Sequence, residues 1–147
     1  MSRDLAARQA DLVAALVADA PVPAGFDPLR VEAARAALLR KRAGGVLRHW
    51  PLLAAGLGDV WLSTFTEWAR TRPPPGPLRD GWDLARSLAA AGTLPALAAE
   101  ELAVREAGWR YDGVGEPRRR RLPALQRGGG AIVLQVAGRV HLLRRPR

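Results

Sequence analysis

Hydrophobic positions recur with a helical period at the start of the chain. Leu5, Leu12 and Leu16 fall on one stripe while charged residues occupy the opposite face, which predicts an amphipathic helix over about residues 3–17. Prolines at positions 21 and 23 end this helix. Asp27 followed by Pro28 supplies an N-cap residue and a proline in the first turn, so a second helix is expected to begin there.

The second helix is expected to run toward Leu47, with the glycine pair at positions 44 and 45 as a kink or an end. The next boundary is predicted at Trp50-Pro51, because a residue before proline disfavours helical geometry. A short apolar turn then precedes a helix that carries Trp61 and Phe65 on one face. The proline run at residues 73–77 must end that helix. Two further helices are predicted, one ending near Gly92 and one from Ala96 to about Arg110.

The pattern changes after Tyr111 from a helical period to β-branched runs. Residues 131–136 and 139–143 are typical of strands joined by Ala137-Gly138, which predicts a β-hairpin. Three glycines at 128–130 form a flexible or tightly turning joint before it. Because an isolated hairpin is marginal in water, it must pack on the helices, pair with a third strand from about residues 121–125, or dock on a partner.

These patterns predict a mainly α protein of the α+β class. Residues 1–112 are expected to form a bundle of about five or six helices. Residues 113–147 are expected to form a small basic β-hairpin subdomain packed on or appended to the bundle.

Charge is distributed unevenly along the 147 residues. The first 116 residues hold equal numbers of basic and acidic side chains, 14 of each, whereas the last 31 hold nine arginines and no acid. The whole net charge of +9 therefore belongs to the predicted hairpin region. An arginine-only region calls for an anionic partner or an acidic neighbouring surface.

The residues that carry common chemistries are scarce. The chain has no cysteine, which excludes disulfides and thiolate nucleophiles, and its two histidines lie far apart without a ligand cluster. No serine lies in a G-x-S-x-G turn, and the glycine run lacks the Lys-Ser/Thr of a phosphate loop. We therefore expect no catalytic residues, no metal and no cofactor. The amino terminus resembles neither a signal peptide nor a membrane span, so a cytoplasmic protein without a membrane partner is expected.

Candidate binding residues come from the basic region and from the exit of the last helix. Arginine grips carboxylates and phosphates with a planar fork, and the alternative is a solvated tail that only keeps the hairpin from pairing with its copies. Trp61, Trp68 and Trp82 are spaced as core residues, whereas Trp109 and Tyr111 favour a surface or inter-subdomain contact. The predicted peptide- or anion-binding residues are Arg118, Arg119, Arg120, Arg121, Arg127, Arg139, Arg144, Arg145, Trp109 and Tyr111. The predicted edge-strand pairing residues are Ile132, Leu134, Val140 and Leu142.

Several segments together resemble a known family. They are the opening helix, the Phe26-Asp27-Pro28 entry to the second helix, and Trp50-Pro51-x-Leu53-x-x-x-Leu57-Gly58 followed by Trp61 and Phe65. The closing segment from Glu101 to Gly113 and the basic hairpin are similar to the C-terminal part of the actinobacterial members of that family. The family comprises small bacterial proteins first classed as DNA-binding domains and later as peptide-modification chaperones of the bufferin and methanobactin type.

This resemblance implies a non-catalytic partner protein rather than an enzyme. Such a partner would bind a ribosomally made, Cys-containing precursor peptide and present it to a multinuclear non-haem iron oxidative enzyme, as a monomer or in a heterodimer. An extended peptide could add to a free hairpin edge, with its acidic side chains near the arginines. The alternative is a DNA-binding protein whose C-terminal arginines contact phosphates.

Overall fold

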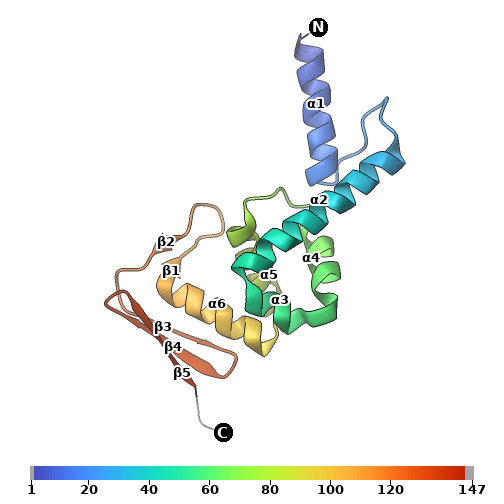
Figure 1. The fold of residues 1–147 in the computed structure, drawn as a ribbon. Coiled ribbons are helices and arrows are strands. Elements are labelled where there is room, and N and C mark those ends of the chain that lie inside the picture. The colour runs from blue at the N-terminus through green and yellow to red at the C-terminus, as the bar shows by residue number, and fades with distance from the viewer. Residues whose placement is uncertain (1, 145–147) are drawn as a thin grey trace.

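The computed structural model describes residues 2–144 and consists of a helical part followed by two small sheets (Figure 1). The helical part contains α1 (Ser2–Val17), α2 (Pro28–His49), α3 (Pro51–Leu57), the 3-10 helix η1 (Gly58–Val60), α4 (Trp61–Ala69), α5 (Pro77–Ala90) and α6 (Ala96–Gly108). The strands are β1 (Trp109–Arg110), β2 (Arg118–Arg119), β3 (Ala124–Gly128), β4 (Ala131–Val136) and β5 (Arg139–Arg144). The predicted fold class is confirmed.

Several helix boundaries lie where the sequence predicts them. The Asp27 carboxylate accepts a hydrogen bond from the Leu29 N–H at 2.9 Å, so it caps α2 as expected. Trp50 leaves helical geometry between α2 and α3. The glycines at 44 and 45 do not end α2, which continues to His49. The last helix, α6, ends at Gly108, two residues before the predicted Arg110, because Trp109 adopts an extended backbone.

Aromatic side chains form the centre of the helical core. Trp50 and Trp82 are fully buried and meet edge to face, with ring centroids 5.8 Å apart. A Cβ at Gly81 would lie 2.1 Å from the Trp50 ring, so only glycine allows α5 to approach that ring. Trp61 is also buried and Trp68 packs against the same core, which confirms the expected role of the spaced tryptophans.

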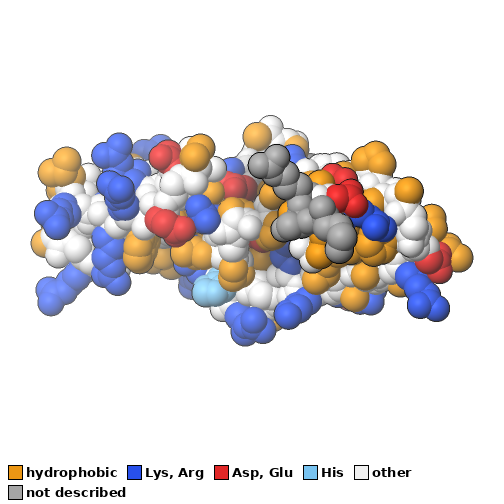
Figure 2. Space-filling model, turned by 90° about the horizontal axis from the view of Figure 1, so that it is seen from above, with side chains coloured by type: hydrophobic (Ala, Val, Ile, Leu, Met, Phe, Trp, Pro, Cys, Tyr) orange, Lys and Arg blue, Asp and Glu red, His pale blue; other side chains and the backbone are white. Residues whose placement is uncertain are grey.

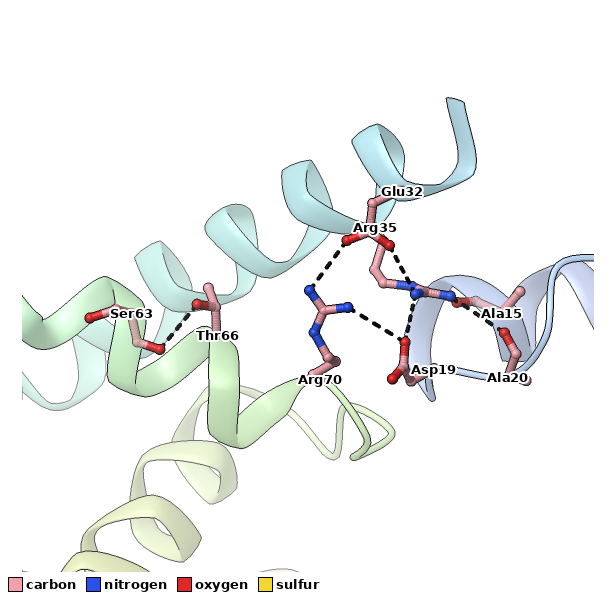
Figure 3. Close-up of polar contacts among 8 residues, drawn as sticks. All are labelled: Ala15, Asp19, Ala20, Glu32, Arg35, Ser63, Thr66 and Arg70. Atoms are coloured by element: carbon pink, nitrogen blue, oxygen red, sulfur yellow. Dashed lines mark hydrogen bonds and ion pairs between the residues drawn. The ribbon is translucent and has the colours of Figure 1, made fainter. Parts of the chain in front are cut away.

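A buried arginine fastens α1 to the rest of the molecule. Arg35 on α2 donates to the Ala15 carbonyl at the end of α1 and to the carboxylates of Asp19 and Glu32 (Figure 3). Arg70, just after α4, pairs with both of those carboxylates. Beyond this contact α1 projects away from the bundle (Figure 1). The network holds the base of the helix with charge-assisted hydrogen bonds, beside the buried Ala15 and Val31.

The two antiparallel sheets lie beside α6 (Figure 1). One consists of β1 and β2, and the other has the order β3-β4-β5. The predicted hairpin is β4 with β5, and β3 is the third strand, located a few residues after the predicted 121–125. Two of the three options for stabilising the hairpin are therefore realised, because it pairs with a third strand and packs on α6.

The glycine run at 128–130 forms a tight turn. Gly129 and Gly130 have φ values of 60° and 81° and join β3 to β4 through a two-residue turn of type I′. A Cβ at Gly128 would lie 2.3 Å from the Ala99 carbonyl oxygen, and one at Gly129 would lie 2.3 Å from that of Ala96. The run therefore lets the turn rest directly on the α6 backbone, and it does not act as a hinge.

Candidate partner-binding surface

The three-stranded sheet turns one face to α6 and the other to solvent. On β4, Ala131, Val133 and Gln135 are buried, while the residues between them face outward. The strand register extends this alternation to both neighbouring strands. The outward face consists of Leu125 and Arg127 on β3, Ile132, Leu134 and Val136 on β4, and Arg139, His141 and Leu143 on β5.

This outer face is apolar in its middle and cationic at two corners. The register places Arg127, Ile132 and Leu143 in one row and Val136 beside Arg139 at the other end. Leu143 is 58% exposed. Figure 2 shows Lys and Arg side chains mixed with hydrophobic ones at the end of the molecule that holds the sheets. Exposed apolar side chains gathered on one small sheet are typical of an interaction site.

The sheet has two edge strands, β3 and β5, and β5 is the edge that carries the predicted pairing residues Val140 and Leu142. Ala137 and Gly138 both have positive φ and form a type I′ turn, so Val136 and Arg139 are the closing hydrogen-bonded pair. Pairing then alternates along the ladder, and every second residue of β5 directs its N–H and C=O away from β4. These outward-directed residues are Val140, Leu142 and Arg144. Within residues 2–144, no other element forms a backbone hydrogen bond to β5.

The edge-strand prediction is therefore half wrong. Ile132 and Leu134 belong to β4, the central strand, whose backbone is paired on both sides. Their side chains contribute to the outer face, but their backbone is closed to an added strand. Val140 and Leu142 do lie on an edge. The sequence could not distinguish the two strands because the third strand starts later than the apolar pattern suggests.

Two of the predicted binding arginines are bonded within the molecule. The Arg120 Nε donates to the carbonyls of Glu106 and Trp109 at 2.8 and 3.1 Å, which satisfies acceptors at the end of α6. Arg144 pairs with the buried carboxylate of Glu100 on α6 at 2.5 Å. Both side chains therefore fasten the strands to α6.

The other predicted arginines are more accessible. The Arg119 guanidinium lies 5.1 Å from the centroid of the half-buried Trp109 ring, as a cation-π pair. Four arginines are exposed and have no ion pair or side-chain hydrogen bond to any residue that the structure describes. They are Arg118, Arg121, Arg127 and Arg139. The predicted Arg145 lies outside the described residues.

Tyr111 belongs to the core and not to the binding surface. Its ring packs 5.2 Å from that of Trp82, and its hydroxyl donates to Asp83 at 3.0 Å. Burial and this hydrogen bond raise the pKa of Tyr111 to about 12. The predicted inter-subdomain contact fits Tyr111, whose largely buried side chain borders a hollow beside α6 and does not reach the outer face of the sheet.

A hollow of about 640 Å³ opens between α6, the two-stranded sheet and the loop that joins β1 to β2. Trp109, Arg110, Arg118 and Arg120 contribute to its walls. Asp112 also lines it, and hydrogen bonds from the backbone N–H groups of Gly115 and Val114 hold the pKa of its carboxyl below the usual value. The sequence did not single out Arg110, because a strand of two residues is too short to show the alternation of polar and apolar residues that marks a strand.

Residues 2–144 contain no group of three or more His, Cys, Asp or Glu side chains arranged to hold a metal ion. Within the same residues no helix combines the length and the apolar character needed to cross a membrane.

Residues 6–90 match the family described as SCO6045-like, C-terminal domain. The chain belongs to this family. The region that this SCO6045-like chain shares with its family begins in α1 and ends with α5, so α6 and both sheets follow it.

A relative of this SCO6045-like chain is a UPF0276 protein of Streptomyces avermitilis, which is 40% identical over 89 residues. The match covers 60% of the chain and 18% of the relative, so the chain corresponds to a small part of a much longer protein. No solved structure matches.

Proposed function

We propose that the chain is a non-catalytic partner protein that binds a ribosomally made precursor peptide and presents it to a multinuclear non-haem iron oxidative enzyme. The observation that carries this proposal is the free edge of β5. Its unpaired N–H and C=O groups at Val140 and Leu142 form a template on which an extended peptide adds as a strand.

The side chains around this edge define the peptide that fits. An added strand would place alternate side chains beside Val140 and Leu142, which are 39% and 37% exposed, and would favour apolar residues there. On the other face its side chains would lie beside Arg139, His141 and Leu143. An acidic residue next to Arg139 would meet an uncommitted guanidinium. The proposed peptide is therefore extended, with alternating apolar residues and an acidic residue near the turn.

The length of the curated relative supports an association with a larger protein. There, a segment similar to this chain forms 18% of one polypeptide. A domain that is covalently joined to a longer chain in one protein is well suited to dock on a separate longer chain in another. We propose that the helices shared with the family dock the enzyme, while the strands that follow them bind the peptide.

Edge pairing is tested by removing one backbone donor. Val140→Pro deletes an N–H that points away from β4, and proline is tolerated on an edge strand, so the ladder to β4 remains. Val140→Thr changes the side chain at the same site but keeps the N–H. Tagged variants are used to capture partners from the native host at about 0.3 M salt, where phosphate contacts are weak.

The expected result is recovery of an iron-containing enzyme and a Cys-containing peptide with wild type and Val140→Thr. With Val140→Pro the peptide is lost and the enzyme is retained. Circular dichroism and thermal melting verify that the proline variant is folded. Equal peptide recovery with both variants would exclude the β5 edge, and recovery of nucleic acid alone would contradict the partner role.

DNA binding is the second candidate, and the exposed Arg118, Arg121, Arg127 and Arg139 are the observation that favours it. On the outer face, however, Arg127 and Arg139 are separated by apolar residues such as Ile132. That arrangement suits a mixed apolar and acidic surface better than a continuous phosphate backbone. Titration of a short duplex at increasing salt distinguishes the two candidates, since phosphate binding predicts a steep loss of affinity.

A further inference from the structure

The two-stranded sheet places two arginines opposite each other. Its register pairs Trp109 with Arg119 and Arg110 with Arg118. The first pair is complementary because the Arg119 guanidinium lies over the Trp109 ring. The second pair joins two like charges, which is destabilising when they face each other directly across a ladder. A ladder of only two residue pairs has little other pairing to offset this repulsion.

Both arginines line the hollow of about 640 Å³, and the other charged groups around them are already bonded. Arg86 donates to the Glu106 carboxylate at 2.7 Å, and Glu116 pairs with Arg79. Arg120 donates to backbone carbonyls. Neither Arg110 nor Arg118 has an ion pair or side-chain hydrogen bond to any residue within 2–144. Among the described residues they are the two arginines of the hollow without a bonded partner, and the charge of Arg118 also favours the ionised form of Asp112.

The net charge of the hollow indicates which anion fits. Its walls hold four arginines (86, 110, 118 and 120) against three carboxylates (Glu106, Asp112 and Glu116), which leaves one positive charge. A monoanionic carboxylate would neutralise this charge. A phosphate, with close to two negative charges at neutral pH, would also be repelled by the three carboxylates. Two guanidinium forks facing one cavity match a carboxylate, since each fork can donate two parallel hydrogen bonds.

We propose that this hollow is a carboxylate-binding site, in which Arg110 and Arg118 together hold an aspartate or glutamate side chain of the bound peptide. The identity of the ligand as a peptide rests on the proposed function, whereas the anion site itself does not. The site lies next to the β5 edge, because a Cβ added at Gly108, the residue directly before β1, would lie 3.5 Å from the Val140 side chain. A peptide on that edge would therefore have the carboxylate site beside the turn end of β5.

Titration of the isotopically labelled chain with blocked tetraglutamate, blocked tetraglutamine and inorganic phosphate tests the site by NMR. We expect tetraglutamate to shift the signals of Arg110 and Arg118, and tetraglutamine to leave them unchanged. Arg110→Gln and Arg118→Gln should each weaken tetraglutamate binding about tenfold, as loss of a charge-assisted hydrogen-bond pair implies. Arg121→Gln is the matched control, since it removes the same charge from an exposed arginine outside the hollow, and it should change affinity less than about twofold.

A second measurement does not depend on binding. Because Arg110 and Arg118 repel each other in the free protein, Arg110→Gln should melt at the same or a higher temperature than wild type at low salt. A lower melting temperature would show that Arg110 is bonded within the protein and would overturn the proposal. Equal weakening of tetraglutamate binding by Arg110→Gln and Arg121→Gln would mean that tetraglutamate responds only to the overall positive charge, and would overturn the site. Tighter binding of phosphate than of tetraglutamate would show that the site does not prefer carboxylates.

The outcomes separate this site from the partner role. Val140→Pro should leave tetraglutamate binding intact, because the carboxylate site does not use the β5 backbone. If tetraglutamate binds between Arg110 and Arg118 but no enzyme or peptide is captured from the host, the anion site stands and the proposed function fails. If the peptide is captured and tetraglutamate does not bind, the proposed function stands and the carboxylate site fails.

Discussion

The helical part of the molecule contains arginines that are largely buried and bonded, Arg35 and Arg42, whereas in the strand part most arginines are exposed and unpaired within residues 2–144. Arg42 donates to both carboxylate oxygens of the buried Asp80 at 2.6 Å and also to the Arg72 carbonyl. Arg35 on α2 likewise donates to the Ala15 carbonyl of α1 and to the Asp19 carboxylate. Neither Arg127 nor Arg139 forms an ion pair with a carboxylate within residues 2–144. The same residue type thus stabilises one region and leaves charge available in the other, so an arginine count alone does not identify a binding surface.

The largest effect is expected from Arg42. Arg42→Gln leaves the Asp80 carboxylate buried without its cation, and breaking such a pair from one side costs about 3–5 kcal/mol of unfolding free energy. Arg139→Gln is the matched control on the exposed surface, with an expected change within about 0.5 kcal/mol. Urea unfolding of both variants measures the difference. Similar losses for the two would show that the contrast between the regions is wrong.

A smaller effect is expected where the sheet rests on α6. Gly129→Ala brings a Cβ to 2.3 Å from the Ala96 carbonyl, which adds about 1–3 kcal/mol of overpacking to the cost of positive φ. Gly130→Ala also places alanine at positive φ, 81° against 60° at Gly129, but its Cβ meets open space. The difference in unfolding free energy between the two variants isolates the close approach. Equal losses would mean that the turn can lift from the helix.

The smallest effect concerns the single tyrosine, which joins the two regions. Ultraviolet absorbance should show Tyr111 ionising near pH 12, well above the ordinary value of 10, because the folded state buries the phenol. The folded state thus holds this proton more tightly than the unfolded state. The resulting stability is complete below pH 10 and is lost as the pH rises from 10 to 12.

Asp83→Asn provides the control for this titration. It removes the carboxylate that accepts the Tyr111 hydroxyl and repels the phenolate, so the pKa should fall toward 10. An unchanged midpoint in Asp83→Asn would mean that burial alone sets the pKa of Tyr111. A midpoint near 10 in the wild type would mean that the tyrosine does not join the strands to the bundle.

The sequence predicted the elements better than their contacts. Asp27-Pro28 and Trp50-Pro51 located helix boundaries because caps and prolines act through neighbouring residues. The partners of Arg42 lie 27 or more residues away in the chain, so no local pattern could separate a bonded arginine from a free one. Helical periodicity could not show that Arg35 is buried among carboxylates.

The strand region shows the same limit in the candidate site. The alternation of residues 131–136 located β4, but whether a strand is central or at an edge depends on a third strand, which begins at Ala124. Arg120 could not be distinguished from its neighbours in the four-arginine run, because its carbonyl acceptors exist only where α6 ends. The sequence shows where the arginines lie along the chain. Only the fold shows which of their guanidinium groups are bonded within the protein and which are free to bind a partner.

The absence of side chains between the glycine turn and α6 has a mechanical consequence for β5. Because Gly128 and Gly129 rest on helical carbonyl oxygens, no flexible layer separates that end of the sheet from the helix. The β5 edge is thus held in one orientation and already has the twist of a paired strand. A peptide that adds to it would lose its own conformational freedom, while the protein would lose little. The affinity of such an edge would therefore depend mainly on how stiff the arriving peptide is.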